Sequence, residues 1–489
     1  MKNDTCRNLD FFPRFRQVSF GKTFLKKYIK IFCSFKYSFY LCPVKPLEIR
    51  KQMIITVKNL GVIKKAEFDI SKKLTVFCGP NATGKTYLAY IIYAVFANKE
   101  FFKLKSYDEI NNSIKKSSSI LLKKEYLDEL LSKIANSCKK TIGEIFGISE
   151  EKEKTFFAKC NVSFSISDED YKAIIEQENT VSIDNKPYTL KKKNTEYIST
   201  ECFQSNIPSN LLWNVILRNL LNYRNAYMLP VERNSIYTFK TELSLSRNQL
   251  LDTILEKKAN ISTITDLLGR KSRRYPLAIK ESLNTANDLE NVQKTNSELY
   301  NFAKELEDKL LHGSISVTQN GDVEYKTTNN VSLPIGISSS IVKTLSSLII
   351  TLKHQTNKGS LLIVDEPEMN FHPDNQVKLA EILAKISNQT PMIVSTHSDY
   401  IIRELNNMIV AKSLEKNGNE TYKKYYEKDS LLDYKDVQVL FFDFGKDGKV
   451  SVKPLDVDEY GFAVESIDKT IRQQNQRTNS LYVEMNKHR

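Results

Sequence analysis

The feature that most constrains the fold of this chain is one eight-residue segment, Gly79-Pro80-Asn81-Ala82-Thr83-Gly84-Lys85-Thr86. It matches the pattern G-x-x-x-x-G-K-[ST] at every fixed position. An apolar stretch, Leu74 to Cys78, precedes the segment, and a second one, Tyr87 to Phe96, follows it. Strand, loop and helix in this order form the context that the pattern requires. The sequence therefore predicts an α/β fold with a phosphate-binding loop.

Each fixed residue of this segment has a chemical role in binding a nucleotide phosphate or its metal ion. Gly79 and Gly84 allow the backbone to fold around phosphate oxygens, because no Cβ atom stands in the way. The N–H groups of the loop and the N-terminus of the following helix add partial positive charge. We expect Lys85 to reach the β- and γ-phosphates of ATP, and the hydroxyl of Thr86 to ligate Mg²⁺.

Two later apolar segments end in polar residues that suit the same site. Leu361 to Val364 indicates a strand buried on both faces, and Asp365-Glu366 follows it. We expect Asp365 to hold Mg²⁺ through water and Glu366 to orient or polarise the attacking water. Pro391 to Thr396 indicates another strand, and His397 at its end is placed to sense the γ-phosphate.

Three segments together resemble an ABC-type ATPase head: Gly79–Thr86, Asp365–Pro373 and Ser395–Ser398. More specifically, they resemble the OLD-like and SMC-like AAA-family ATPases of bacteria, of the kind found in anti-phage defence systems. In that group the strand that corresponds to Leu361 to Val364 continues into D-E-P-E-x-x-L-H-P. A later strand ends in S-T-H-S. Phe371 stands here in place of the usual leucine, and one apolar side chain thus replaces another.

This resemblance implies a P-loop fold of the ABC-head type, with a mixed, mostly parallel sheet, flanking helices, an antiparallel β layer and helical insertions. It also implies that two copies sandwich ATP head to head. His397 would then be the switch histidine, and Asn370 to Pro373 would form the loop that crosses the pair. A glutamine that bridges Mg²⁺ and water in ABC heads has no obvious counterpart in this sequence.

A head-to-head pair needs a segment that contacts the nucleotide of the opposite copy. The candidate is Leu333 to Lys343, in which Ser338, Ser339 and Ser340 precede an apolar helix that runs from Ile341 to Leu352. The three hydroxyls can cap free helix N–H groups or bind the γ-phosphate of the partner. The transporter sequence L-S-G-G-Q is absent.

A further segment, Tyr227 to Arg233, resembles one that these ATPases carry ahead of their helical insertion. Two interpretations stay open for it. Glu232 or Arg233 faces the nucleotide or the partner head, or these residues form a structural ion pair.

The formal charge of +14 suggests a polyanionic partner, but it is unevenly distributed. Residues 1–52 hold 12 Lys/Arg and 3 Asp/Glu, a net charge of +9, which leaves +5 for the other 437 residues. Met53 is followed at once by an apolar strand pattern. We interpret residues 1–52 as an upstream extension of the reading frame; the alternatives are a basic aromatic arm for a membrane or nucleic acid, and a poorly ordered tail.

Cysteine spacing and hydropathy point to a cytoplasmic protein. The seven Cys residues lack paired spacing, which favours reduced thiols and argues against a zinc knuckle. No stretch approaches the ~20 uncharged apolar residues of a membrane span. The chain divides into five expected segments: 1–52, the extension; 53–234, an N-lobe with the phosphate loop; 235–312, a helical insertion; 313–410, a C-lobe; and 411–489, a C-terminal hairpin and helix.

The insertions and the C-terminus add partner predictions. Arg270, Lys271, Arg273 and Arg274 form a basic cluster that either contacts nucleic acid or an acidic partner or is a solvated surface. Only 92 residues follow His397, and Asp456 and Asp458 indicate capping at the start of a helix. We therefore expect no fused nuclease, and we expect a hairpin with a primed turn at 446–448.

These observations favour an ATPase that dimerises or oligomerises on ATP and acts as a sensor or regulator for a separately encoded effector protein. Three alternatives stay open. The first is a scaffold held together by ATP with slow turnover, and the second is an SMC-like DNA-maintenance ATPase. The third, the energising subunit of a transporter, is disfavoured by the atypical serine segment.

Overall fold

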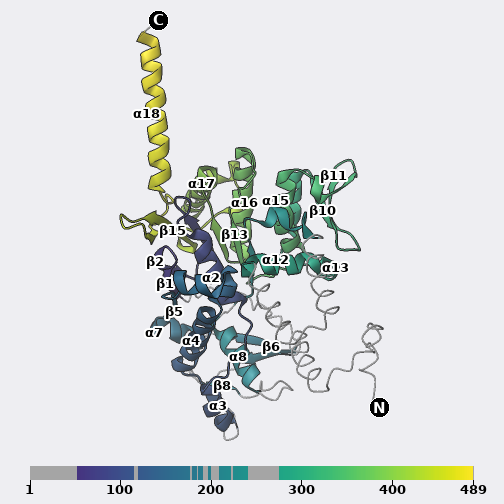
Figure 1. Ribbon diagram of the computed structural model, residues 1–489, viewed down its shortest axis with the longest axis vertical. Helices are drawn as coiled ribbons and strands as arrows, with labels where there is room; N and C mark the ends of the chain where they lie inside the picture. Colours follow the sequence, from purple (N-terminus) through teal and green to yellow (C-terminus); the bar gives the residue numbers. More distant parts are fainter. Residues whose placement is uncertain are drawn as a thin grey trace.

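A mixed sheet of nine strands forms the centre of the computed structural model (Figure 1). The structure describes residues 52–114, 119–176, 179–183, 186–190, 197–199, 209–221, 224–240 and 275–487. The predictions for the extension up to residue 51 and for the basic cluster Arg270–Arg274 lie outside these residues. In spatial order the strands are β5 (Asn161–Ile166), β1 (Met53–Leu60), β2 (Ile63–Asp69), β16 (Val450–Leu455), β15 (Val437–Phe444), β3 (Leu74–Cys78), β14 (Met392–Ser395), β13 (Leu361–Asp365) and β9 (Ala226–Leu229).

The parallel part of this sheet consists of β15, β3, β14, β13 and β9. All residues of β3 and β13 are buried, as the apolar runs predict for strands covered on both faces. Their side chains alternate between two cores, so that Phe77 and Ile363 lie in one and Val76 and Val364 in the other. The predicted mixed, mostly parallel sheet with flanking helices is therefore confirmed.

The antiparallel strands continue the same sheet at its other end. β1 pairs antiparallel with both β2 and β5, and β16 links this part to the parallel strands through β15. The alternating pattern of residues 162–166 correctly predicts β5. A separate hairpin pairs β6 (Asn179–Ile183) with β7 (Lys186–Leu190), and a short pair joins β4 (Ser119–Leu121) to β8 (Tyr197–Ser199).

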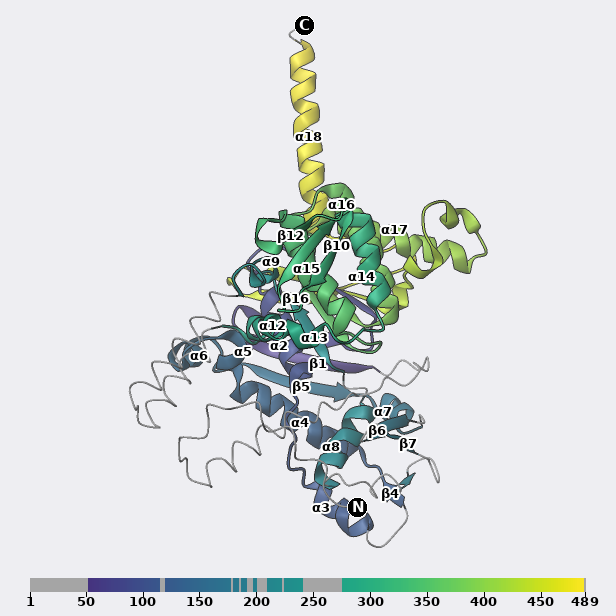
Figure 2. The ribbon, with the colours of Figure 1, turned by 90° about the vertical axis from the view of Figure 1, so that its right-hand side faces the viewer.

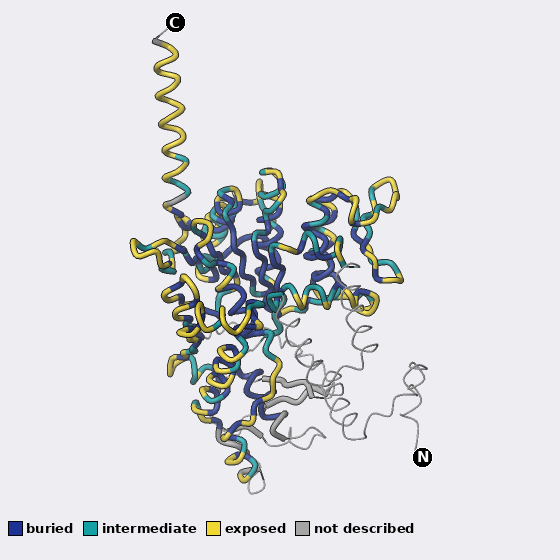
Figure 3. The backbone as a smooth tube through the Cα atoms, viewed as in Figure 1, coloured by how far each residue is buried: buried dark blue, intermediate teal, exposed yellow. Residues whose placement is uncertain are grey.

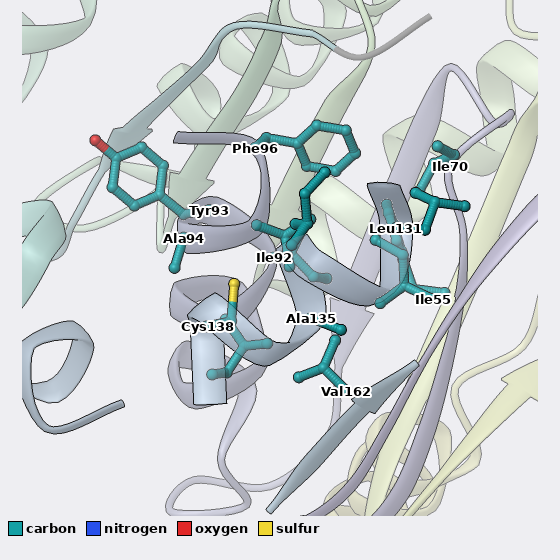
Figure 4. Close-up of a cluster of buried hydrophobic side chains, with 14 of the residues drawn as sticks. Ile55, Ile70, Ile92, Tyr93, Ala94, Phe96, Leu131, Ala135, Cys138 and Val162 are labelled. Carbon is teal, nitrogen blue, oxygen red and sulfur yellow. The ribbon is translucent and has the colours of Figure 1, made fainter. Parts of the chain in front are cut away.

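Helices cover one face of the sheet with a large apolar core. In Figure 4, Ile92 and Phe96 of α2 (Lys85–Ala97) and Leu131 of α4 (Lys124–Lys140) pack near Ile55 of β1. α8 (Ser209–Leu220) adds the fully buried Trp213. The other helices of this half are α3 (Ser106–Ile114), α5 (Ile142–Phe146), α6 (Glu150–Phe156) and α7 (Asp168–Glu176).

The opposite face is covered by helices from the C-terminal half. α15 (Ser340–His354), α16 (Pro373–Gln389) and α17 (Asp399–Lys416) share a core with α14 (Tyr300–Leu306) and its π-helical continuation η2 (Glu307–Leu311). Leu299, Leu306 and Leu310, which recur at helical spacing, are buried in this core. The remaining elements are α9 (Arg233–Ile236), α12 (Leu277–Asn287), α13 (Leu289–Val292), η3 (Ile335–Ile337), and a sheet of β10 (Gly313–Val317), β11 (Val323–Thr327) and β12 (Ser332–Pro334).

The C-terminal hairpin forms where the sequence predicts it, but its turn differs. β15 and β16 pair antiparallel, and Gly448 has a φ of +72°. Neither Lys446 nor Asp447 is among the residues with positive φ, whereas a primed turn requires a positive φ at the first central residue, and type I′ requires it at both. The N–H of Gly448 donates to the carbonyl of Gly445 instead, so the turn is of the ordinary hand with one left-handed glycine after it.

The chain continues from this hairpin into one long helix, α18 (Glu465–Lys487). Its first turns lie against the body, and the rest extends away from it in both views (Figures 1 and 2). Asp458 lies in the preceding turn, where its carboxylate accepts from the N–H of Tyr460 at 2.8 Å, so it caps a turn and not the start of a helix as expected. Among the described residues, no helix is both long enough and apolar enough to cross a bilayer.

Candidate nucleotide-binding site

The loop between β3 and α2 adopts a conformation that requires glycine. Gly79 and Gly84 have φ values of +131° and +88°, and Ala82 between them has +62°. A Cβ atom on Gly79 would lie 2.3 Å from the carbonyl oxygen of Phe442 in β15. The loop is therefore shaped both by its own backbone and by a strand that the chain reaches more than 350 residues later.

Lys85 begins α2 and folds back over the loop. Its ammonium donates to the carbonyls of Gly79 (3.1 Å) and Pro80 (2.7 Å), and only 6% of the residue is exposed. Burial lowers the pKa of Lys85 to about 8, although the nearby carboxylates of Glu366 and Asp365 act in the opposite direction. A phosphate in the loop would offer this charge stronger acceptors than two carbonyls.

This lowered pKa gives a testable pH dependence. We expect the Kd for ATP to rise about tenfold for each pH unit above pH 8, because the neutral amine must take up a proton to pair with phosphate. Titration calorimetry at pH 7, 8 and 9 measures the slope. Lys85→Arg is the matched control, since a guanidinium stays charged over this range. An equal slope in both proteins would reject Lys85 as the source.

Thr86 and Asp365 meet at the carboxyl ends of the parallel strands. The hydroxyl of Thr86 donates to Oδ2 of Asp365 at 2.8 Å, and Ser395 donates to the other carboxylate oxygen. These oxygen donors fit a hard cation such as Mg²⁺, which keeps several waters and takes few protein ligands. Consistent with this, the described residues contain no cluster of three or more His, Cys, Asp or Glu side chains placed to hold a metal ion.

Glu366 and His397 stand next to this oxygen pair. His397 Nε2 lies 3.7 Å from Oε1 of Glu366. Glu366 has a φ of +46°, a strained conformation for a residue other than glycine. Burial and the charge of Asp365 raise the pKa of Glu366, whereas burial and the charge of Lys85 lower the pKa of His397 below its usual value near 6.5. The lowered pKa of His397 favours the neutral form of its imidazole.

Glu368 has a positioning role that the sequence did not assign. One oxygen of its carboxylate accepts from the hydroxyl of Thr396 at 2.7 Å and from the N–H of His397 at 2.8 Å. These bonds tie the segment after β13 to the segment after β14. His397 is thus held in place through its backbone by Glu368, the last acidic residue of the D-E-P-E sequence.

Arg233 is buried against the backbone of the two carboxylates. The residue is 2% exposed, and its guanidinium donates to the carbonyls of Asp365 (2.5 Å) and Glu366 (2.6 Å). Burial lowers its pKa to about 10. Arg233 therefore fixes the backbone that carries Asp365 and Glu366, a contact that the sequence did not predict. Glu232 is exposed at the start of α9.

Arg233→Lys should separate positioning from binding. One ammonium cannot reproduce both bonds of a planar guanidinium, so the backbone at Glu366 loses a support. We expect kcat to fall about 10- to 100-fold and KM for ATP to change less than about threefold. Arg224→Lys is the control, because Arg224 also donates to a carbonyl, that of Ile70, and its pKa is also lowered to about 10. A loss confined to thermal stability in both variants would contradict the positioning role.

The serine segment lies at the start of α15. Ser338 is buried and donates to the carbonyl of Pro334 at 3.2 Å. Ser339 is the N-cap residue, yet its side chain makes no capping hydrogen bond, and both Ser339 and Ser340 are exposed. Capping by Ser339, one of the two alternatives, is thus not observed, and two hydroxyls remain available at a helix N-terminus.

A pocket of about 610 Å³ opens beside the phosphate loop and the switch histidine. One side is formed by the loop itself and by Thr396 and His397, and the other by α17 and the first turns of α18. Its lining residues are Gly79, Pro80, Asn81, Thr396, His397, Asp399, Tyr400, Arg403, Ile467, Thr470 and Ile471. The root of α18 therefore borders the nucleotide site.

A phosphate loop on a central parallel strand, with a threonine and an aspartate meeting beside it, defines a P-loop ATPase. Comparison with models of known protein families identifies the family within this class. The family model described as AAA ATPase domain matches residues 53–402, and the chain belongs to that family.

Solved structures with a similar arrangement share little sequence with this chain. An Smc head domain with an extended coiled coil, bound to the C-terminal domain of ScpA and derived from Pyrococcus furiosus, is 14% identical; the match covers 87% of this chain and 99% of that one, with a TM-score of 0.36. The SMC head domain from Thermotoga maritima is 10% identical over 83% of this chain and 100% of that one, with a TM-score of 0.32. No curated protein matches the chain.

Proposed function

We propose that this protein hydrolyses ATP between two copies that pair head to head, and that it passes its nucleotide state to a separately encoded effector in anti-phage defence. Hydrolysis is supported by the convergence of Lys85, Thr86, Asp365, Glu366 and His397 at one edge of the sheet. The segments that supply them lie up to 312 positions apart in the sequence, from Lys85 to His397.

The geometry supports a specific division of labour among these residues. The loop N–H groups and Lys85 bind the phosphates, and Thr86 and Asp365 would hold Mg²⁺, which neutralises phosphate charge when bound. Glu366, with its raised pKa, orients a water and accepts its proton as that water attacks the γ-phosphate. The neutral His397 can donate an N–H to a γ-phosphate oxygen.

Pairing is supported by the serine segment and the loop expected to cross the pair. Ser339 and Ser340 present exposed hydroxyls at the N-terminus of α15, where a partner's γ-phosphate would be stabilised. Asn370 in the crossing loop has a φ of +68° and donates to the hydroxyl of Thr344 in α15 at 3.2 Å. This bond links the crossing loop of one head to its own signature helix.

Ser339→Tyr tests the pairing. A bulky side chain at this helix start should block a partner phosphate, so the mass measured by light scattering with a slowly hydrolysed ATP analogue should stay that of the nucleotide-free protein. Ser149→Tyr is the matched control, because Ser149 is also an exposed N-cap residue without a capping bond. Normal ATP-driven association of Ser339→Tyr would overturn the head-to-head proposal.

The defence role is supported by the resemblance of the Asp365–Pro373 and Ser395–Ser398 segments alone. Plaque counts on cells that carry the intact gene neighbourhood, or the same neighbourhood with Lys85→Ala, test it. Equal counts across a broad phage panel would reject the role. The slow-turnover scaffold is a second candidate, favoured by Ser338, whose hydroxyl is engaged within its own chain.

A further inference from the structure

The outer part of α18 has an apolar face that nothing in the described part of the chain covers. Every residue from Arg472 to Asn486 is exposed, which amounts to ~22 Å of helix at ~1.5 Å per residue. In Figure 3 this stretch is exposed along its whole length. Its tip carries four large apolar side chains with exposed fractions of 50% or more: Leu481, Tyr482, Val483 and Met485.

A heptad pattern runs along α18, beginning at the residue just before it. Spacings of three and four alternate through Val464, Ile467, Ile471, Gln474, Thr478, Leu481 and Met485, of which all but Gln474 and Thr478 are apolar. We call these seven residues the α18 seam. Val464 is buried and Ile467 packs on the core, so the body of the protein covers the first part of the seam. Such a seam is the pattern by which one helix packs along another.

A solitary helix of this composition would be unstable. The exposed stretch contains Asn, Ser and Thr, which are weak helix formers, and a free helix of ~15 residues is marginal even for alanine-rich sequences. In this stretch the side chains of Arg472 and Ser480 donate hydrogen bonds to carbonyls of α18 itself. Packing of the seam against another helix would supply the missing stabilisation.

We propose that the tip of α18 pairs antiparallel with the α18 tip of a second copy of this chain. The argument is charge complementarity along the edge of the seam. Arg477 and Glu484 both occupy the position just before a seam residue. An antiparallel pair that sets Thr478 against the second copy's Leu481 also sets Arg477 against the second copy's Glu484, and two-fold symmetry repeats this contact. A parallel pair would place Arg477 against Tyr482.

This contact goes beyond the proposed function because it needs no nucleotide. Antiparallel tips hold the two bodies at opposite ends of the helix pair, so the joined heads are not the two that would share one ATP. The tips would therefore link separate heads, or head-to-head pairs, into larger assemblies. A pair of ~15 residues per helix is smaller than a standard interface, so the association should be weak, about micromolar or weaker.

Charge exchange tests the contact and its direction. We expect sedimentation equilibrium without nucleotide to show concentration-dependent dimers of the full chain. Arg477→Glu and Glu484→Arg should each weaken the dimer about fivefold or more, and the double exchange should restore it. A chain that stays monomeric at all concentrations, or a double variant no better than the single ones, would overturn the proposal. A lipid surface or a different protein would then be the occupant of the seam.

The polar seam positions allow a gain-of-association test that is insensitive to misfolding. Gln474→Leu should tighten the dimer about tenfold, because two glutamines leave the seam and two leucines enter it. Gln476→Leu is the matched control, since Gln476 lies about 200° around the same exposed helix and should have no effect. Equal effects of both variants would contradict pairing through the seam. ATP turnover of both variants should stay at the wild-type level, which separates this proposal from the proposed function.

Discussion

Glu366→Gln should lower ATP turnover by about 10²- to 10⁴-fold, because the amide cannot accept a proton from the attacking water. ATP binding should persist, since the loop and Lys85 are unchanged. The raised pKa of Glu366 places its proton affinity closer to neutral pH, as suits a general base. Phosphate release under steady-state conditions measures turnover, and titration with labelled ATP measures binding.

The matched control for this experiment is Glu324→Gln in β11. Glu324 is half-buried like Glu366 but lies outside the nucleotide site. The Glu324→Gln variant should therefore hydrolyse ATP at the wild-type rate. Wild-type turnover no greater than that of Glu366→Gln would remove the hydrolysis proposal. The slow-turnover scaffold would then be the better description.

Gly79→Ala should abolish ATP binding and destabilise the whole fold. The new Cβ atom would lie 2.3 Å from the carbonyl oxygen of Phe442, and the φ of +131° is outside the range that alanine favours. Because the obstacle is backbone in the middle of the sheet, no side chain can move aside. We expect the free energy of unfolding to fall by about 3–5 kcal/mol and ATP affinity to fall by more than about 100-fold.

Gly418→Ala separates the clash from the backbone strain. Gly418 has a φ of +75°, and a Cβ atom there would meet nothing within 4 Å. Its cost should be about 1 kcal/mol, from the conformation alone. Denaturant unfolding of the two variants gives the comparison. Equal costs at both positions would show that β15 does not hold the loop as described.

The sequence predicts the parallel strands and the phosphate loop well because each depends on local patterns. The apolar runs at 74–78 and 361–364 can only be strands buried on both faces, and the polar residues after them must then meet at one edge. The order of the strands in the sheet cannot be predicted from such local patterns. Nothing in residues 437–444 indicates that they pair with β3, because their alternating pattern suits any position in a half-buried sheet.

In the candidate site, too, residues that belong to sequence motifs are predictable, and a residue placed by tertiary contacts is not. Thr86, Asp365 and His397 belong to patterns whose chemistry fixes their place. Arg233 does not, because its hydrogen bonds go to backbone carbonyls, which every residue offers and no sequence pattern marks. The resemblance of the segment Tyr227 to Arg233 and the adjacent Glu232 are the available signals, and neither says which carbonyls the guanidinium binds.

The position of β3 has a consequence for synthesis of the protein. β3 lies between β14 and β15, so both of its edges are completed by strands that leave the ribosome more than 300 residues later. Until then the nascent chain carries an apolar strand with unpaired edges, which chaperones would have to shield. A chain truncated before Val437 could not close the sheet around the loop, so incomplete translation should yield no ATP-binding product.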